Sequence, residues 1–237
     1  MKTSTQITVL FLSMSILLSN AHGQGTFQNL DFELSPVDLG PGLGSDYYSI
    51  PYWSAIMGPY QGGVLLNDYV LDATTVSLQT GRLFTPIDGT TSLFLTASSY
   101  GYPLSTASIS QTGLVPTTAK SLHFLVADVM AFELPPTLPG QFFVTMGGEN
   151  VALQVVANYD SYTELAGNIS NWAGQTTALS IGVSVPASQG PEIYFQGLID
   201  DISFSPTSVP EPTTTVLGIL AGGCWLLCRR ATGAESV

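Results

Sequence analysis

Residues 197–204 read GLIDDISF, and this stretch is the last strand that the sequence predicts. Successive side chains of a strand point to opposite faces. One face is therefore expected to carry Leu198, Asp200, Ile202 and Phe204. Because most of this set is apolar, it is the expected core face, and Asp200 is expected to point inward. An unpaired buried carboxylate is costly, so Asp200 needs a cation, a basic partner or several hydrogen-bond donors.

The chain between its two apolar ends is patterned in the same way. Short runs rich in β-branched and aromatic residues alternate with turn signals, and no long window repeats apolar residues at helical spacing. Expected strands include a first strand at 27–34 (FQNLDFEL), a central strand at 122–129 (LHFLVADV) and a hairpin that pairs 142–146 with 151–156. About ten such strands predict an all-β fold, a two-sheet antiparallel β-sandwich or jelly roll over residues 24–205.

The N-terminal end has the three parts of a secretory signal peptide. Lys2 gives it a basic start, and residues 7–18 (ITVLFLSMSILL) form a short apolar core. Ala21 and Gly23 are the small residues of a cleavage site. Cleavage is expected after Gly23, with Ala21 as the alternative, which assigns residues 1–23 to the signal peptide. The mature chain is therefore expected outside the cytoplasm.

Residues 206–237 are expected to form a linker and a membrane-directed tail. The tail contains an uncharged apolar run at 213–228 (TTTVLGILAGGCWLLC). A spanning helix needs roughly 17–25 residues. The run therefore crosses a membrane only with its flanking residues included, as a transmembrane helix over about 212–228. Two arginines follow the run, in agreement with the positive-inside rule.

The motifs around this run add a more specific signal. They consist of Val209, Pro210, Glu211 and Pro212 before the run and Arg229 and Arg230 after it. This order resembles the PEP-CTERM sorting signal of exported bacterial proteins. The resemblance implies that an exosortase, a membrane protease-transpeptidase, processes the chain near the Pro-Glu-Pro element. It also implies a protein that crosses the inner membrane, is anchored at least transiently, and then reaches the cell surface or the extracellular polysaccharide. The alternative is an ordinary C-terminal anchor that begins with prolines.

Composition excludes several classes of partner. The net charge is −12, and all 17 acidic residues except Glu211 and Glu235 lie in the body, whose only basic side chains are Arg82 and Lys120. Nucleic-acid binding requires clustered Lys and Arg, so it is excluded. Binding to an anionic membrane surface is disfavoured for the same reason. Both cysteines lie in the C-terminal apolar run, so no disulfide framework holds the body.

The two ends of the body carry a second resemblance. The opening NLDFE (29–33) and the closing LIDDISF (198–204) are similar to the galactose-binding-like jelly rolls, a group that includes many carbohydrate-binding modules. That resemblance implies a structural calcium ion that joins Glu33 to Asp200, with Asp31 and Asp201 as weaker ligand candidates. The alternative is that backbone donors or Ser and Thr hydroxyls satisfy Asp200 without a metal ion.

Catalysis has little support in the sequence. His123 is the one histidine of the body, and a lone histidine within a strand is more often structural than a catalytic base. No nucleophile elbow, zinc-protease, Walker or Rossmann motif occurs. Glycoside hydrolysis requires two opposed carboxylates, and nothing singles out such a pair. The expected function is therefore that of a non-catalytic surface or extracellular-matrix protein.

Sugar binding is the main alternative function. A carbohydrate-binding module acting on extracellular polysaccharide would use exposed aromatic rings, which stack on pyranose rings. Tyr52 and Trp53 lie in a Pro-, Gly- and Tyr-rich segment and are the candidate ligand-binding residues. A core position for Trp53 is the competing interpretation. A glycan-active enzyme is the least favoured of the three hypotheses.

Overall fold

The computed structural model describes residues 26–41, 46–68, 73–99, 105–132, 142–185 and 194–209. Within these ranges the chain is all-β, apart from one 3₁₀ turn at Ser170–Trp172. The predicted signal peptide (1–23), the predicted transmembrane helix (212–228) and residues 210–230 of the sorting signal lie outside the described ranges. No helix inside them is long and apolar enough to span a membrane.

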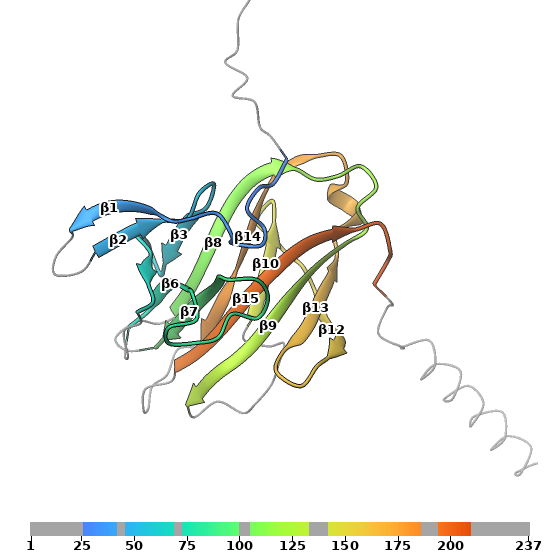
Figure 1. The fold of residues 1–237 in the computed structure, drawn as a ribbon. Coiled ribbons are helices and arrows are strands. Elements are labelled where there is room, and N and C mark those ends of the chain that lie inside the picture. The colour runs from blue at the N-terminus through green and yellow to red at the C-terminus, as the bar shows by residue number, and fades with distance from the viewer. Residues whose placement is uncertain are drawn as a thin grey trace, which may run out of the picture.

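Two sheets face each other and form the predicted β-sandwich (Figure 1). The six-stranded sheet has the spatial order β11 (Glu149–Asn150), β10 (Phe142–Met146), β14 (Thr176–Val185), β8 (Ser105–Leu114), β3 (Ser54–Met57) and β4 (Tyr60–Gln61). The seven-stranded sheet has the order β12 (Leu153–Asn158), β13 (Thr163–Asn168), β9 (Ser121–Phe132), β15 (Tyr194–Ser205), β7 (Ser92–Ser98), β6 (Thr75–Gln79) and β5 (Leu65–Leu66). All pairs are antiparallel except β5–β6.

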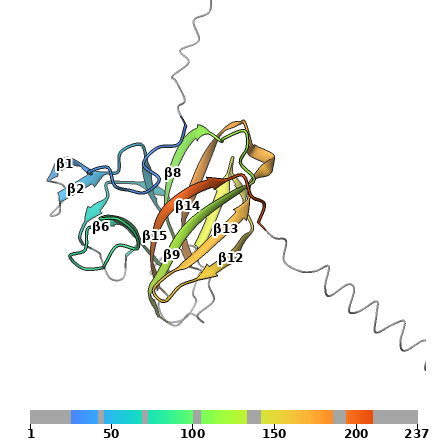
Figure 2. The same cartoon turned by 45° about the vertical axis from the view of Figure 1, so that its right-hand side comes forward.

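A small two-stranded sheet extends from one side of the sandwich. It pairs β1 (Val37–Pro41) with β2 (Asp46–Ser49). Figure 2 shows this hairpin standing away from the two main layers, while β9 and β15 run side by side across the front layer. The predicted central strand at 122–129 is confirmed, because β9 lies between β13 and β15 in the seven-stranded sheet.

Alternate side chains of the long strands fill the space between the sheets. The fully buried set includes Leu122, Phe124 and Val126 from β9 and Leu179, Ile181 and Val183 from β14, each 0% exposed. Complete burial of a side chain of this size contributes roughly 1.5–3 kcal/mol. The burial of these side chains in one shared core is therefore a main source of the stability of the sandwich.

A β-bulge in β15 decides which of its side chains reach this core. Between Asp200 and Ser203, the two residues Asp201 and Ile202 oppose a single residue of β9. Asp201 has a φ of 45°, in the left-handed region. An extra residue reverses the alternation beyond it, so Ile199 and Ile202 both belong to the core.

The bulge makes the predicted alternation of this strand wrong. Leu198 and Asp200 lie on the outer face of the sheet. Ile199, which lies between them, points into the core instead. Asp200 is nevertheless 1% exposed, because a loop covers it from outside. The sequence hint was weak: aspartate tolerates the left-handed conformation better than most residues, but Asp-Asp occurs in ordinary strands as well.

Two other predicted elements are also wrong. Residues 27–34 form an irregular segment, in which Asn29 and Phe32 have φ values of 51° and 57°. Here the Asn29 side-chain oxygen accepts a hydrogen bond from the Leu34 N–H (3.0 Å), a local bond that competes with strand pairing. The predicted hairpin forms at its turn, where β10 pairs with β11, and the Val151 N–H donates to the Val144 carbonyl of β10 (2.9 Å). Its predicted second strand at 151–156 is wrong beyond Val151. Val151 is buried where the chain changes sheets, and β12 then pairs with β13.

The bulge predicts a substitution effect at Asp201. Replacement by valine should lower the free energy of unfolding by roughly 1–2 kcal/mol, because a β-branched residue is strained at positive φ. The Asp201→Asn variant is the control, since asparagine tolerates this conformation. Urea unfolding followed by tryptophan fluorescence measures both. Equal losses in the two variants would contradict a conformational role for this position.

Candidate functional site

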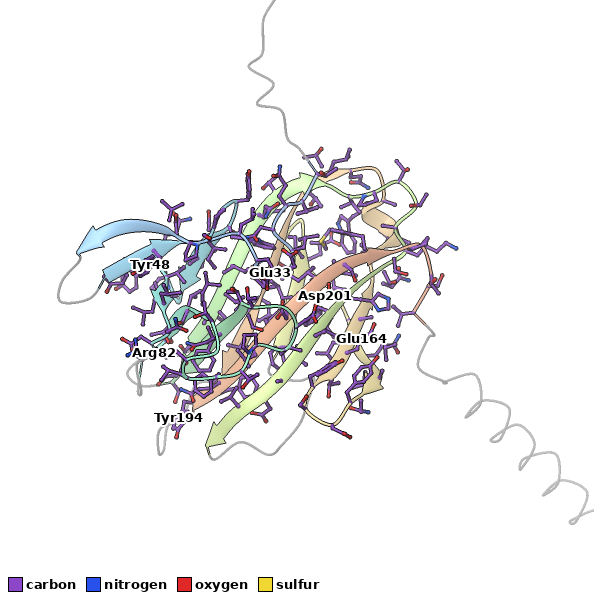
Figure 3. All side chains as sticks on the ribbon, in the orientation of Figure 1. Glu33, Tyr48, Arg82, Glu164, Tyr194 and Asp201 are labelled. Carbon is purple, nitrogen blue, oxygen red and sulfur yellow. The ribbon has the colours of Figure 1, made fainter. Side chains whose placement is uncertain are left out.

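Two carboxylates hold the loop between β6 and β7, residues 80–91, against the outer face of the seven-stranded sheet. Glu33, which is labelled in Figure 3, comes from the N-terminal segment. Asp200 comes from β15, close to the end of the domain. The structure therefore brings both residues of the predicted calcium site to one loop. Each carboxylate contacts a different part of the loop, and the two together are here called the clamp.

Asp200 binds the base of the loop. Its Oδ2 accepts hydrogen bonds from the Asp88 N–H (3.2 Å) and the Ser92 hydroxyl (2.5 Å), and its Oδ1 accepts one from the Asp201 N–H (2.8 Å). Burial nevertheless raises the pKa of Asp200 from 3.8 to about 6, and the nearby Asp88 carboxylate adds to that rise. Hydrogen bonds to the ionised form oppose the shift without cancelling it.

Glu33 binds the tip of the loop and is exposed. Its Oε1 accepts hydrogen bonds from the N–H groups of Thr90 (2.8 Å) and Thr91 (2.9 Å), and its Oε2 accepts one from the Thr90 hydroxyl (2.5 Å). Burial opposes ionisation, but these hydrogen bonds together lower the pKa of Glu33. Gly89 has a φ of 57°, and a Cβ there would collide with the Glu33 carboxylate. The tip therefore requires glycine.

The contacts of this clamp bear on the predicted calcium ion. All the hydrogen-bond partners named for Glu33 and Asp200 are N–H or O–H donors, whereas calcium takes oxygen ligands. In the part of the chain that the structure describes, no group of three or more His, Cys, Asp or Glu side chains is placed to hold a metal ion. Asp31 accepts a hydrogen bond from the Glu33 N–H (3.4 Å), and Asp201 lies exposed on the bulge. These contacts favour the metal-free alternative, and calcium binding stays a prediction.

The predicted aromatic pair is divided between surface and core. Trp53 is 6% exposed, and its Nε1–H donates to the Asn29 carbonyl (2.9 Å). Its ring packs near Phe32, with 6.0 Å between ring centroids, so it offers no free face to a ligand. Tyr52 is 59% exposed and has a φ of 72°, a conformation that is rare for a bulky residue and often marks a functional position.

The seven-stranded sheet carries a pocket of about 300 Å³ on its outer face. Its lining consists of Leu83, Phe84, Thr85, Pro86, Ile87, Ala127, Ser161, Tyr162 and Leu198. Ala127 of β9 and Leu198 of β15 come from the sheet, and the clamped loop and the turn before β13 supply the rest. No lining residue is charged, although the chain as a whole has a net charge of −12.

Both aromatic residues of the pocket are supported by a second ring. Phe84 stacks on Phe94 of β7, with 4.8 Å between centroids and 14° between planes. Tyr162 stacks on Tyr159, with 4.5 Å between centroids and 28° between planes. Stacking limits the motion of each ring. The pocket therefore combines preformed aromatic surface with the hydroxyl groups of Thr85, Ser161 and Tyr162.

The outer face of the six-stranded sheet carries an uncharged row of hydroxyl side chains. One row across four strands contains Ser54, Ser110, Ser180 and Thr145, each paired with the next. The residues between them along the strands, such as Ile109 and Ile181, point into the core. This face therefore presents short hydroxyl side chains, which form hydrogen bonds but offer little stacking surface.

The lone histidine belongs to a hydrogen-bonded chain. His123 Nε2 lies 2.9 Å from Ser121 Oγ, and His123 Nδ1 lies 2.7 Å from Glu164 Oε1. This order of groups is the one used in nucleophilic hydrolysis. Ser121, however, is 0% exposed, and its hydroxyl donates to the Thr207 carbonyl (2.7 Å). A buried hydroxyl that already donates elsewhere is poorly placed to attack a substrate.

Sequence reasoning missed the pocket because its walls come from distant segments. Residues 83–87 (LFTPI) lie in none of the strands predicted above, and nothing in the sequence connects them with Tyr162. The available signal was the apolar character of residues 83–87. Connecting segments are usually polar and rich in turn residues, so an apolar loop indicates a surface that it covers.

Comparison with known proteins finds distant likenesses only. No known family and no curated protein matches the sequence. Among solved structures, the enzymatically active domain of tailspike protein 4 from bacteriophage CBA120 has a TM-score of 0.39 at 12% identity, over 77% of this chain and 21% of that one. This chain thus spans about a fifth of the tailspike chain.

Two carbohydrate-binding modules are similar at the same level. The family 11 module from Clostridium thermocellum, in complex with a β-1,3-1,4-mixed-linked tetrasaccharide, has a TM-score of 0.37 at 8% identity, over 74% of this chain and 98% of that one. The family 11 module of the cellulosomal cellulase Lic26A-Cel5E of the same organism has a TM-score of 0.35 at 9% identity, over 75% of this chain and 98% of that one.

Asp200 predicts an acid-stabilised fold. Because its folded-state pKa is raised from 3.8 to about 6, the folded protein holds the proton more tightly than the unfolded chain. The resulting stabilisation is complete below about pH 4 and is lost as the pH rises through about 6. At about 1.36 kcal/mol per pKa unit, the loss is about 3 kcal/mol. We expect this loss of unfolding free energy in the native protein and not in the Asp200→Asn variant. Urea unfolding at several pH values between 4 and 7 measures it.

A bound calcium ion would reverse this sign, so the same measurement tests the metal. Calcium binds the ionised carboxylate, and its stabilisation would be lost as the pH falls. Thermal unfolding of the native protein with calcium and with EDTA provides the second readout. A melting temperature that falls with EDTA, but not in Asp200→Asn, would establish the ion. Equal melting temperatures of the native protein with calcium and with EDTA would indicate that hydrogen bonds alone hold Asp200.

Proposed function

We propose that this protein is a non-catalytic, exported bacterial surface or extracellular-matrix protein that binds neutral polysaccharide. We propose further that its C-terminal tail is a sorting signal that an exosortase processes. The observation that carries the binding proposal is the uncharged pocket between residues 83–87 and Tyr162, with its two supported rings. A binding site that is neutral in an otherwise acidic protein favours a ligand without charge.

A sugar ring fits the chemistry of this pocket. A pyranose has apolar C–H faces and a rim of hydroxyl groups, which match stacked rings beside hydroxyl side chains. The pocket volume of about 300 Å³ is at the small end of the usual range for ligand sites. This size suits one ring of a chain whose neighbouring sugars extend along the surface.

The lining also supports a binding role in preference to an enzymatic one. Glycoside hydrolysis uses a pair of carboxyl groups on either side of the scissile bond. No Asp or Glu is among the lining residues of the pocket. Together with the buried position of Ser121, this supports the proposal that the protein is non-catalytic.

The position of the sorting motif supports the second part of the proposal. β15 ends at Ser205, and Val209 is 8% exposed, so the described fold continues to the first residue of the VPEP motif. Pro210 follows directly. A membrane enzyme that acts near Pro-Glu-Pro would therefore act next to the edge of the sandwich.

Neutral oligosaccharides test the binding site. We expect purified full-length protein, in a detergent without sugar groups, to bind some neutral tetrasaccharides by calorimetry and not oligogalacturonate. The Tyr162→Ala variant loses a stacking interaction worth about 1.4 kcal/mol. It should therefore bind about tenfold more weakly. Tyr60→Ala is the matched control, because Tyr60 is 63% exposed and lies in the other sheet.

Two further variants distinguish the competing surfaces. Tyr52→Ala tests the turn predicted from the sequence, and Ser110→Glu introduces a charge into the hydroxyl row of the six-stranded sheet. Weaker binding in one of these, with Tyr162→Ala unchanged, would move the site away from the pocket. Failure to bind any neutral oligosaccharide would contradict the binding proposal.

Intact-mass analysis tests the sorting proposal. In a host that contains an exosortase, we expect the mature protein to lack residues 1–23 and to be cleaved near Pro210–Pro212. Replacement of Pro210, Glu211 and Pro212 by alanine should leave the tail attached. A mature product with its tail intact in the native host would indicate an ordinary membrane anchor.

A further inference from the structure

Four groups on the outer face of the seven-stranded sheet form one continuous chain of hydrogen bonds. It runs from Glu164 on β13 through His123 and Ser121 on β9 to the carbonyl of Thr207. Thr207 belongs to residues 205–209, here called the exit segment, which connects β15 to the VPEP motif. The three contacts measure 2.7, 2.9 and 2.7 Å in that order.

The direction of each hydrogen bond follows from the chemistry of its atoms. A carbonyl oxygen can only accept, so the Ser121 hydroxyl donates its one proton to Thr207. Ser121 Oγ must then accept from a protonated His123 Nε2. His123 Nδ1 faces the Glu164 carboxyl group, and this contact requires a proton on one of the two atoms. When all three hydrogen bonds exist, His123 and Glu164 together therefore hold one proton more than a neutral imidazole and an ionised carboxylate would hold.

Most charged groups near this chain are carboxylates. The carboxylate of Asp201 on β15 interacts with those of Glu164 on β13, Asp88 in the clamped loop and Asp31 in the N-terminal segment. Directly opposite His123 are the uncharged Ser203 of β15 and Ala166 of β13. Lys120, two residues before His123, is the basic side chain nearest in sequence.

The exit segment has few other hydrogen bonds to the sheet. The Lys120 N–H donates to the Ser205 carbonyl (2.8 Å), and the Thr207 N–H donates to the Ser205 hydroxyl (3.1 Å) within the segment itself. Beyond Ser205, the Ser121–Thr207 bond connects the described part of the exit segment to the sandwich. Its loss would leave the buried Val209 side chain as the remaining described contact at the end of the segment.

We propose that Ser121, His123 and Glu164 form a proton-dependent latch on the exit segment. With the additional proton, all three hydrogen bonds exist together. Without it, a neutral imidazole that donates from Nδ1 to the Glu164 carboxylate leaves Nε2 without a proton, and Nε2 then competes with the Thr207 carbonyl for the one hydroxyl proton. The other neutral tautomer, with its proton on Nε2, would place two acceptors against each other at Glu164 and is therefore disfavoured. The latch opens as the pH rises and frees the chain before Pro210. This inference rests on the proposed function only for its consequence, the access of a processing enzyme to the tail.

Hydrogen exchange of the exit segment tests the latch. Full-length protein is compared between pH 5 and 9, with each rate divided by that of an unstructured peptide of the same sequence. NMR of the His123 ring in the same sample gives its titration. We expect protection of residues 205–209 to fall about fivefold, as for one hydrogen bond, over the pH range in which His123 titrates. Residues 122–126 of β9 should show no such step.

Variants separate the latch from a general loss of stability. Ser121→Ala should show low protection at every pH, because it lacks the hydroxyl that donates to Thr207. His123→Gln should show constant protection without the step, because no imidazole competes for that hydroxyl proton. Glu164→Gln should change the pH of the step, because the imidazole loses its carboxylate partner. Glu149→Gln is the matched control, since Glu149 is an exposed carboxylate in the other sheet, and it should behave as the native protein.

Two results would overturn the latch. One is protection in the native protein that stays constant while His123 titrates, and the other is a step that persists in Ser121→Ala. If His123→Gln does not fold, the small Ser121→Ala change still decides the matter. The sugar-binding experiment is independent of this one. If the protein binds oligosaccharide but shows no pH step in protection, only the latch is contradicted. If it shows the step but binds no oligosaccharide, only the proposed ligand is contradicted.

Discussion

The pairing of β15 with both of its neighbours is the constraint on which the rest of the molecule depends. This strand forms hydrogen bonds with β9 along one edge and with β7 along the other. The bulge at Asp201 allows Ile199 and Ile202 to enter the same core while Asp200 is turned outward. A strand with strict alternation would have placed that carboxyl group among apolar side chains, where no basic partner exists.

Turning Asp200 outward also organises the surface. The carboxyl group binds the loop after β6, and Glu33 binds the tip of the same loop from the N-terminal segment. The clamped loop carries Phe84 onto Phe94 of the sheet and so builds one wall of the pocket. The first and last segments of the domain, the loop and the candidate ligand site are therefore mechanically connected.

Charge is distributed unevenly over this face. The Asp201 carboxylate interacts with those of Asp31, Asp88 and Glu164 beside the clamp, while the pocket lining and the hydroxyl row of the opposite sheet are uncharged. These four carboxylates therefore leave the pocket and the hydroxyl row as neutral surface. The single imidazole of the body lies at the border of the acidic region, where its Nδ1 is 2.7 Å from Glu164 Oε1 and its Nε2 contacts the exit segment through Ser121.

The sequence by itself determined the fold class, the central position of β9 and the apolar character of the two ends, because these follow from local periodicity and composition. It also singled out Asp200, since a buried acid without basic partners must find other ones, and the resemblance to jelly rolls added Glu33. Only the tertiary structure decided that Trp53 belongs to the core, that β12 changes sheets, and that the bulge directs Asp200 outward. It alone assembled the pocket and the Ser121–His123–Glu164 chain. Each of these depends on contacts between segments far apart in sequence, and pairing register and bulges carry almost no local signature.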